Sequence, residues 1–172
     1  MKEIQLTKGK KALVDDADYD WLNQWKWYAM NSRGSYYACR TSVNKGIKRY
    51  ILMHRLIFSG IHPSCLVDHI DGDGLNNQKS NLRSCNNKQN VRNSKPIIGT
   101  SKYKGVSFSS DRKKWQAKIK HNGNSIWIGY FDYESDAAIA YNEAAKMYHG
   151  EFARLNHIRT FDPNLINKVT QD

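Results

Sequence analysis

The stretch Leu66-Val67-Asp68-His69-Ile70-Asp71-Gly72-Asp73-Gly74 joins a short apolar run to an abrupt turn. Its first five residues have the pattern of a strand, and the glycine that follows provides the positive φ that a tight turn needs. Further along the chain, residues 82–93 are polar but compatible with a helix. The pattern therefore predicts a strand or hairpin that carries Asp68 and His69 and faces a helix that carries Asn90.

The side chains of this segment suit the hydrolysis of a phosphodiester. A neutral imidazole such as that of His69 can accept the proton of an attacking water, because its ordinary pKa lies near ~6.5. A divalent cation can stabilise the charge on the phosphate and on the leaving oxygen. Carboxylate and carboxamide oxygens, as in Asp68 and Asn90, suit Mg²⁺ or Mn²⁺. The residues thus predict a site for one such ion.

The string HRL…VDHIDGDGLNN…NLR…QNVRN lies within residues 48–93 and resembles the HNH homing endonucleases, whose active site is a ββα-metal fold. The resemblance implies that His69 is the general base and that Asn81 holds the active-site hairpin in register. It also implies that Asp68 and Asn90 are the metal ligands. The third letter of the motif is His in the name-giving proteins and Asn here, which favours a single Mg²⁺ or Mn²⁺ over zinc or nickel. A single-metal site with one base is compatible with nicking one DNA strand.

Other polar residues near this motif have structural interpretations. Asp71 and Asp73 suggest a calcium loop, but Leu82 occupies the twelfth position, where such a loop needs Glu, so we interpret them as turn-formers. His54 is expected to pack or to touch a phosphate rather than to act in catalysis. For Arg55, phosphate stabilisation and a structural ion pair both remain open.

A second pattern, of three strands followed by a helix, occupies residues 102–157. Residues 114–120 alternate as a half-buried strand should, and Asn122-Gly123 is typical of a two-residue hairpin. After Asp132, a helix cap, apolar residues recur at helical spacing as far as Gly150. We therefore expect a three-stranded antiparallel sheet packed on one helix.

Charge is divided between these elements. Residues 102–125 contain seven basic residues and one acidic residue, whereas residues 131–151 contain five acidic residues and one basic residue. On the middle strand, Lys114, Lys118 and Lys120 share one face, and Trp115 shares the opposite face with apolar residues. The sheet should therefore present a cationic face of the right shape to enter a major groove.

The stretch SKYKGVSF…WQAKIK…WIGYFD…AAIAYNEAA…GEFARLN resembles the plant AP-two (ethylene-response-factor) DNA-binding domain, which reads DNA with its sheet. The resemblance implies that Trp115 packs under the helix and leaves two roles open for Trp127, stacking on the DNA backbone or core packing. Several family arginines are replaced here, and Lys118 stands where the family has Glu, so the base preference should differ. The expected DNA-binding residues are Lys102, Lys104, Ser107, Ser109, Arg112, Lys114, Lys118, Lys120, Ser125 and Trp127.

Composition limits the class of protein further. The net charge of +11 and the pI near 9.6 favour a polyanionic partner. No apolar run approaches the ~20 residues of a membrane span, and no signal peptide follows Met1. The three cysteines form no CxxC pair and no disulfide framework, which indicates a reducing setting.

The expected fold class is α+β, with two domains joined by a linker. Residues 1–93 form the nuclease domain, in which an N-terminal β region (1–53) precedes the ββα-metal motif (54–93). A linker (94–101), the AP-two-like domain (102–157) and a tail (158–172) follow.

We expect a site-specific homing-type DNA endonuclease, which either cuts both DNA strands or nicks one. We expect it to be encoded by a phage or mobile element and to be present in the host cytoplasm. Its partner is double-stranded DNA, and we expect a monomer that needs neither a membrane nor a protein partner. Two alternatives remain: a DNA-binding regulator with an inactive HNH module, and a structure-specific repair or restriction nuclease.

Overall fold

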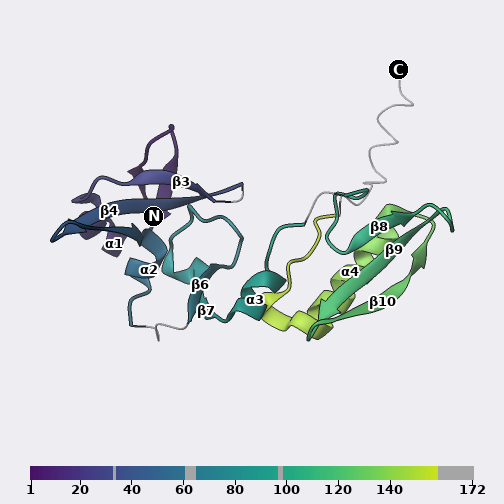
Figure 1. Ribbon diagram of the computed structural model, residues 1–172. Coiled ribbons are helices and arrows are strands. Elements are labelled where there is room, and N and C mark those ends of the chain that lie inside the picture. The colour runs from purple at the N-terminus through teal and green to yellow at the C-terminus, as the bar shows by residue number, and fades with distance from the viewer. Residues whose placement is uncertain (33, 61–64, 97–98, 159–172) are drawn as a thin grey trace, which may run out of the picture. The chain divides into compact units, whose positions relative to one another are not determined.

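The computed structural model describes residues 1–32, 34–60, 65–96 and 99–158 (Figure 1). The chain divides into two compact units, Met1–Ser94 and Lys95–Asp172. In the described residues, no helix is long and apolar enough to cross a membrane. The tail expected at 158–172 lies, except for Ile158, outside the described residues, as do two residues of the linker, 97 and 98.

The N-terminal unit combines small antiparallel sheets with short helices. A β1–β2 hairpin precedes α1, a sheet of order β3-β4-β5 leads into α2, and the β6–β7 pair precedes α3. The bounds are β1 Lys2–Gln5, β2 Lys11–Val14, α1 Asp16–Asn23, β3 Tyr28–Ser32, β4 Ser35–Asn44, β5 Ile47–Leu52, α2 Met53–Ile57, β6 Leu66–His69, η1 Lys79–Asn81, β7 Leu82–Cys85 and α3 Asn87–Arg92.

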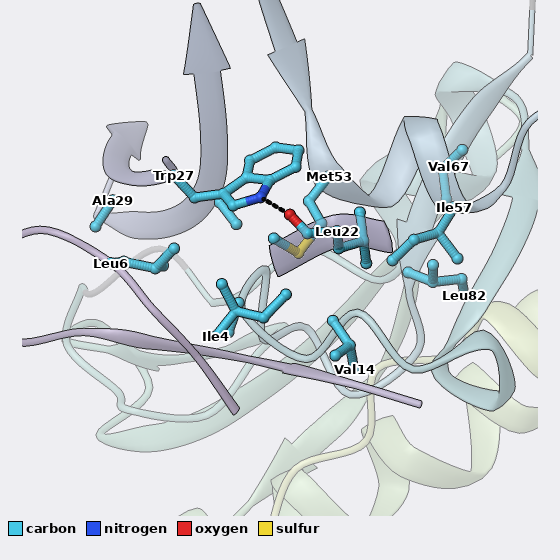
Figure 2. Close-up of a cluster of buried hydrophobic side chains, with 12 residues drawn as sticks. Ile4, Leu6, Val14, Leu22, Trp27, Ala29, Met53, Ile57, Val67 and Leu82 are labelled. Carbon is cyan, nitrogen blue, oxygen red and sulfur yellow. Dashed lines mark hydrogen bonds between the residues drawn. The ribbon is translucent and has the colours of Figure 1, made fainter. Parts of the chain in front are cut away.

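One apolar cluster joins these elements. Ile4, Val14, Leu22 and Met53 are almost fully buried and come from four different elements. Figure 2 shows the Trp27 indole among them, where its Nε1 donates a hydrogen bond to the backbone oxygen of Leu22 at 2.9 Å. The indole thus buries its ring while its polar atom keeps a partner.

The segment 82–93 differs from the sequence-based expectation of one continuous helix. Leu82 and Cys85 are buried and pair with His69 and Leu66 across the β6–β7 ladder, so these residues form a strand. The helix starts only after Asn86, whose side chain accepts from the Gln89 amide at 2.9 Å while the Gln89 side chain accepts from the Asn86 amide at 2.8 Å. This capping box fixes the start of α3.

The C-terminal unit is a three-stranded antiparallel sheet of order β10-β9-β8, and α4 contacts all three strands. Small residues on α4, Ala137, Ala138 and Ala145, are fully buried and let the helix approach the sheet closely. The bounds are β8 Val106–Ser109, β9 Lys114–His121, β10 Asn124–Phe131, α4 Glu134–His149 and η2 Gly150–Phe152.

A substitution at Gly105 tests how closely the helix and the sheet pack. Gly105 has φ +73°, and a Cβ added there would lie 2.1 Å from the ring of Tyr141 and 2.6 Å from the Lys118 oxygen. Gly105→Ala should therefore lower the free energy of unfolding by about 3 kcal/mol or more, from overpacking added to backbone strain. Gly123→Ala is the matched control, because Gly123 has φ +87° but open space around it, and it should cost only about 1–2 kcal/mol. Urea denaturation measures both, and equal losses would contradict the packing argument.

Candidate active site

The end of β6 places Asp68 and His69 side by side, and both are buried. The carboxylate of Asp68 lies opposite Arg83 in the β6–β7 ladder. Arg83 donates to Asp68 Oδ2 from Nε at 3.0 Å and from Nη2 at 2.8 Å, and the Nδ2 of Asn93 lies 3.0–3.1 Å from both carboxylate oxygens. A buried carboxylate with these partners is balanced in charge and fixed in orientation.

The imidazole of His69 is oriented by Asn77. Its Nε2 lies 3.5 Å from Asn77 Oδ1, a long contact to a fully buried side chain. Asn77 is itself held, because its Nδ2 donates to the Leu75 oxygen at 3.0 Å and its amide donates to the Leu13 oxygen at 2.8 Å. A carboxamide oxygen only accepts, so this contact favours the tautomer that is protonated on Nε2 and leaves Nδ1 able to take a proton.

Two further rings contact His69. The ring of His54, on α2, lies 4.8 Å away edge-on, and the ring of Tyr37, on β4, lies 5.9 Å away. Burial, helped by the neighbouring His69, lowers the pKa of His54 to about 3. Burial also lowers the pKa of His69, although Asn77 and the nearby carboxylates oppose that shift. Both imidazoles are therefore neutral at neutral pH, and His54 packs against the site.

Asn81 connects the two ends of the loop between β6 and β7. Its Nδ2 donates to Asp71 Oδ1 at 3.0 Å and to the Asn76 oxygen at 2.9 Å, and its Oδ1 accepts from the Asp71 amide at 3.0 Å. Burial would raise the pKa of Asp71, but hydrogen bonds from the Asp73 amide, Asn76 and Asn81 outweigh it and lower the pKa. Asp71 and Asp73 both accept from loop amides, as turn-forming residues do.

The two asparagines at the end of the motif lie in different surroundings. Asn90 is on α3 and exposed. Asn93 follows the helix, is buried, and donates to Asp68 and to the backbone oxygen of His69 at 2.8 Å. The structure therefore brings Asp68 together with Arg83 and Asn93, two residues to which the sequence analysis gave no role. An acidic and a basic residue opposite each other on paired strands would have been the available signal for Arg83.

The donor set near Asp68 suits a hard cation. Among the described residues no three His, Cys, Asp or Glu side chains converge. Asp68 Oδ1 has Asn93 Nδ2 as its hydrogen-bond partner, so it retains capacity to accept further bonds. A carboxylate oxygen, an amide oxygen of the α3 region, water and phosphate would form an all-oxygen shell, which is the environment that Mg²⁺ or Mn²⁺ prefers.

In the C-terminal unit, the strand register groups seven of the ten expected DNA-binding residues on the side of the sheet away from α4, whereas Lys102, Lys104 and Arg112 lie outside the strands. Trp127 lies opposite Lys118 and Ser125 lies opposite Lys120. We call this side the outer face; it consists of Ser107, Ser109, Lys114, Gln116, Lys118, Lys120, Ser125, Trp127 and Tyr130.

Aromatic and cationic groups are adjacent on the outer face. Trp127 is 55% exposed, which separates it from the core, and its ring lies 5.5 Å from that of Tyr130. The guanidinium of Arg112 lies 4.9 Å from the Tyr130 ring. Trp115 is on the opposite side, partly buried and packed against the core cluster of this unit.

The two basic residues before β8 differ in exposure. Lys102 is exposed, with its ammonium 5.1 Å from the Tyr103 ring. Lys104 is half-buried, and burial, with Arg154 nearby, lowers its pKa to about 8.

Burial of His54 predicts acid sensitivity of the metal-free protein. The unfolded chain protonates His54 near its ordinary pKa of 6.5, whereas the folded protein does so only near 3. Stability is therefore lost as the pH falls below 6.5, by about 3 kcal/mol at pH ~4. His54→Phe keeps an aromatic ring at this position but cannot be protonated. Between pH ~7 and ~4, its free energy of unfolding should therefore fall by about 3 kcal/mol less than that of the wild type. Urea denaturation in EDTA measures the difference, and equal losses would contradict the assignment.

Comparison with known proteins identifies the family. No family model matches the chain. It is 34% identical over 152 residues to an uncharacterized HNH endonuclease of Acanthamoeba polyphaga mimivirus, which covers 88% of this chain and 77% of that protein. It is 32% identical over 111 residues to protein 3.8 of Escherichia phage T7, which covers 64% of this chain and 91% of that protein.

A further match concerns plant proteins. The chain is 42% identical over 65 residues to dehydration-responsive element-binding protein 2C of Arabidopsis thaliana, which covers 36% of this chain and 18% of that protein. Together with the mimivirus relative, this match confirms the resemblance to the HNH and AP-two families. The chain belongs to the HNH endonuclease family.

Proposed function

We propose that the chain is a homing-type, metal-dependent endonuclease that nicks or cuts double-stranded DNA at a defined site. In this proposal residues 54–93 form a ββα-metal motif, and the sheet of residues 102–157 anchors the enzyme on DNA. The observation that carries the proposal is that a fixed carboxylate, Asp68, directly precedes a neutral imidazole, His69, at the end of one strand. The phage and mimivirus relatives support a mobile-element or phage origin and a host-cell setting.

His69 would be the general base. Its Nδ1 would accept the proton of the attacking water, while its Nε2–H stays directed at Asn77 Oδ1. The carboxylates of Asp68, Asp71 and Asp73 favour the imidazolium that results. Asn81 would keep this loop in the conformation that the reaction requires, through its bonds to Asp71 and Asn76.

Asp68 and Asn90 would hold the cation, and a bound Mg²⁺ or Mn²⁺ would supply neutralisation of charge on the phosphate and on the leaving oxygen. Asn93 has a separate role in this proposal. Its Nδ2 donates to Asp68 and to the backbone oxygens of His69 and Ile70, and these hydrogen bonds would fix the end of β6 in position. Asn90 lies three residues earlier on α3, about one helical turn away, and its side chain is exposed.

Variants at these positions separate catalysis from folding. His69→Ala should lower the rate of nicking of supercoiled DNA in Mg²⁺ or Mn²⁺ by about 10²–10⁴-fold, the usual contribution of a general base, with nearly unchanged DNA affinity. Asn90→Ala removes a proposed metal ligand from an exposed position, so it should abolish the metal-dependent reaction while the protein stays folded. Asn93→Ala removes a hydrogen-bond partner of the buried Asp68, so it should lower the free energy of unfolding by about 2 kcal/mol or more. Full activity of His69→Ala would remove His69 from the mechanism.

The same assay tests whether the chain is an enzyme. Incubation of the wild-type chain with Mg²⁺, Mn²⁺ or EDTA should yield nicked or cut DNA only with a metal. Supercoiled DNA left intact in every lane, with DNA binding retained, would instead favour the regulator with an inactive HNH module. General degradation of the DNA would point to a nuclease without a defined site.

The outer face would bind DNA through its lysines and its exposed Trp127. Lys118→Ala combined with Lys120→Ala should weaken DNA binding and reduce the slope of log K against log salt by about 2, since each phosphate contact contributes about 0.9. Lys11→Ala with Lys146→Ala is the charge-matched control, because these lysines pair with Glu3 and Glu143. An equal slope in both double variants would contradict this docking face.

A further inference from the structure

The distal half of the β4–β5 hairpin projects beyond the core of the N-terminal unit. Every residue from Val43 to Tyr50 is exposed, including the apolar side chains of Val43 (67%), Ile47 (59%) and Tyr50 (64%). The two strands stay paired to the tip, where Lys45 and Gly46 form a two-residue turn with positive φ. This two-stranded ribbon therefore keeps its shape without a hydrophobic core beneath it.

The ribbon is cationic and lies in a segment without acidic residues. Residues 21–67 contain seven Lys or Arg residues and no Asp or Glu. Three of the basic residues, Lys45, Lys48 and Arg49, are on the exposed part of the hairpin. In the part of the chain that the structure describes, the ion pairs involve none of these three. Their charge is thus available to a polyanion.

Strand β4 connects the ribbon to the candidate active site. Tyr37, near the start of β4, contacts the ring of His69. By alternation, Tyr37 shares a face of β4 with Thr41 and Val43, whose partners on β5 are Tyr50 and Lys48. The Lys48 ammonium lies 5.5 Å from the Tyr50 ring. At about 3.3 Å per residue, the turn at Lys45 lies about 26 Å from Tyr37, the length of roughly seven to eight base pairs.

We propose that residues 41–50 are a second DNA-binding element, which lies along the duplex to one side of the cleaved phosphate. Lys48 on one face of the ribbon, Arg49 on the other and Lys45 at the turn would contact backbone phosphates, and the exposed Val43 and Tyr50 would face the sugars or groove edges of the DNA. A two-stranded ribbon has the right width for a major groove. This inference rests on the proposed function for its partner, and a second copy of the chain is disfavoured because equal cationic ribbons repel each other.

The first test measures the salt dependence of DNA binding by the full chain. The variant Lys45→Ala/Lys48→Ala/Arg49→Ala is compared with Lys2→Ala/Lys11→Ala/Lys146→Ala, which removes the same net charge from lysines that pair with Asp20, Glu3 and Glu143. Binding to an arbitrary duplex of about 40 base pairs is measured in EDTA, so that cleavage plays no part. The slope of log K against log salt should fall by about 2–3 in the ribbon variant and by less than ~1 in the control. Equal slopes would overturn the proposal.

The second test locates the contact. Acetylation of surface lysines, followed by mass spectrometry, should show Lys45 and Lys48 protected several-fold by the duplex, whereas Lys2 and Lys11 react at the same rate with or without DNA. Unprotected Lys45 and Lys48 would overturn the proposal. So would a ribbon variant with an unchanged slope but altered sedimentation without DNA, because the hairpin would then join copies of the chain.

The DNA-binding measurements on the ribbon and the cleavage assays on the nuclease can give opposite results, so they test the two proposals independently. If the wild type does not cut DNA but the ribbon variant loses salt slope, the DNA-binding ribbon stands and the endonuclease proposal falls. If the wild type cuts in Mg²⁺ and the ribbon variant keeps its slope, the endonuclease stands and the ribbon falls.

Discussion

The buried carboxylate of Asp68 is the constraint on which the N-terminal unit depends. Left alone in this position, a charged group would cost several kcal/mol of desolvation. Arg83 from the paired strand and Asn93 from the end of α3 offset that cost with short hydrogen bonds. Since each partner comes from a different element, satisfying one charge also fixes β7 and the end of α3 relative to β6. The same contacts hold Asp68 beside His69.

Burial among aromatic rings and the nearby carboxylates have opposite effects on the pKa of His69. Burial among Tyr37 and His54 keeps the imidazole neutral, so that it can accept a proton, while Asp68, Asp71 and Asp73 favour the charged form. For the proposed role of His69 as the general base, both influences matter, because a strongly lowered pKa would make it too weak to take a proton and a raised pKa would leave it already protonated. Neither ring contact could be inferred from the sequence, since β4 and α2 reach His69 only through the tertiary fold.

Local patterns predicted more of the C-terminal unit than of the candidate active site. The alternation of residues 114–120, the Asn122-Gly123 turn and the small face of α4 act over a few residues, so the sheet and helix followed from the sequence. The segment after Ile70 is polar and weakly periodic. There, the boundary between β7 and α3 depended on the burial of Leu82 and Cys85 and on the Asn86 cap. The roles of Asn77, Arg83 and Asn93 required the cross-strand register and the end of α3, which no local pattern encodes.

The Arg83–Asp68 ion pair also means that folding of the N-terminal unit does not depend on a bound metal ion. In zinc modules, the ion itself assembles the ligands, and the chain unfolds when a chelator removes it. Here a guanidinium already provides the positive charge that Asp68 needs. The charge of Asp68 is therefore balanced within the fold, and the scaffold needs no bound ion to form. Under the proposed function, the protein would exist as a folded, chemically silent form whose activity follows the supply of divalent ions in its surroundings.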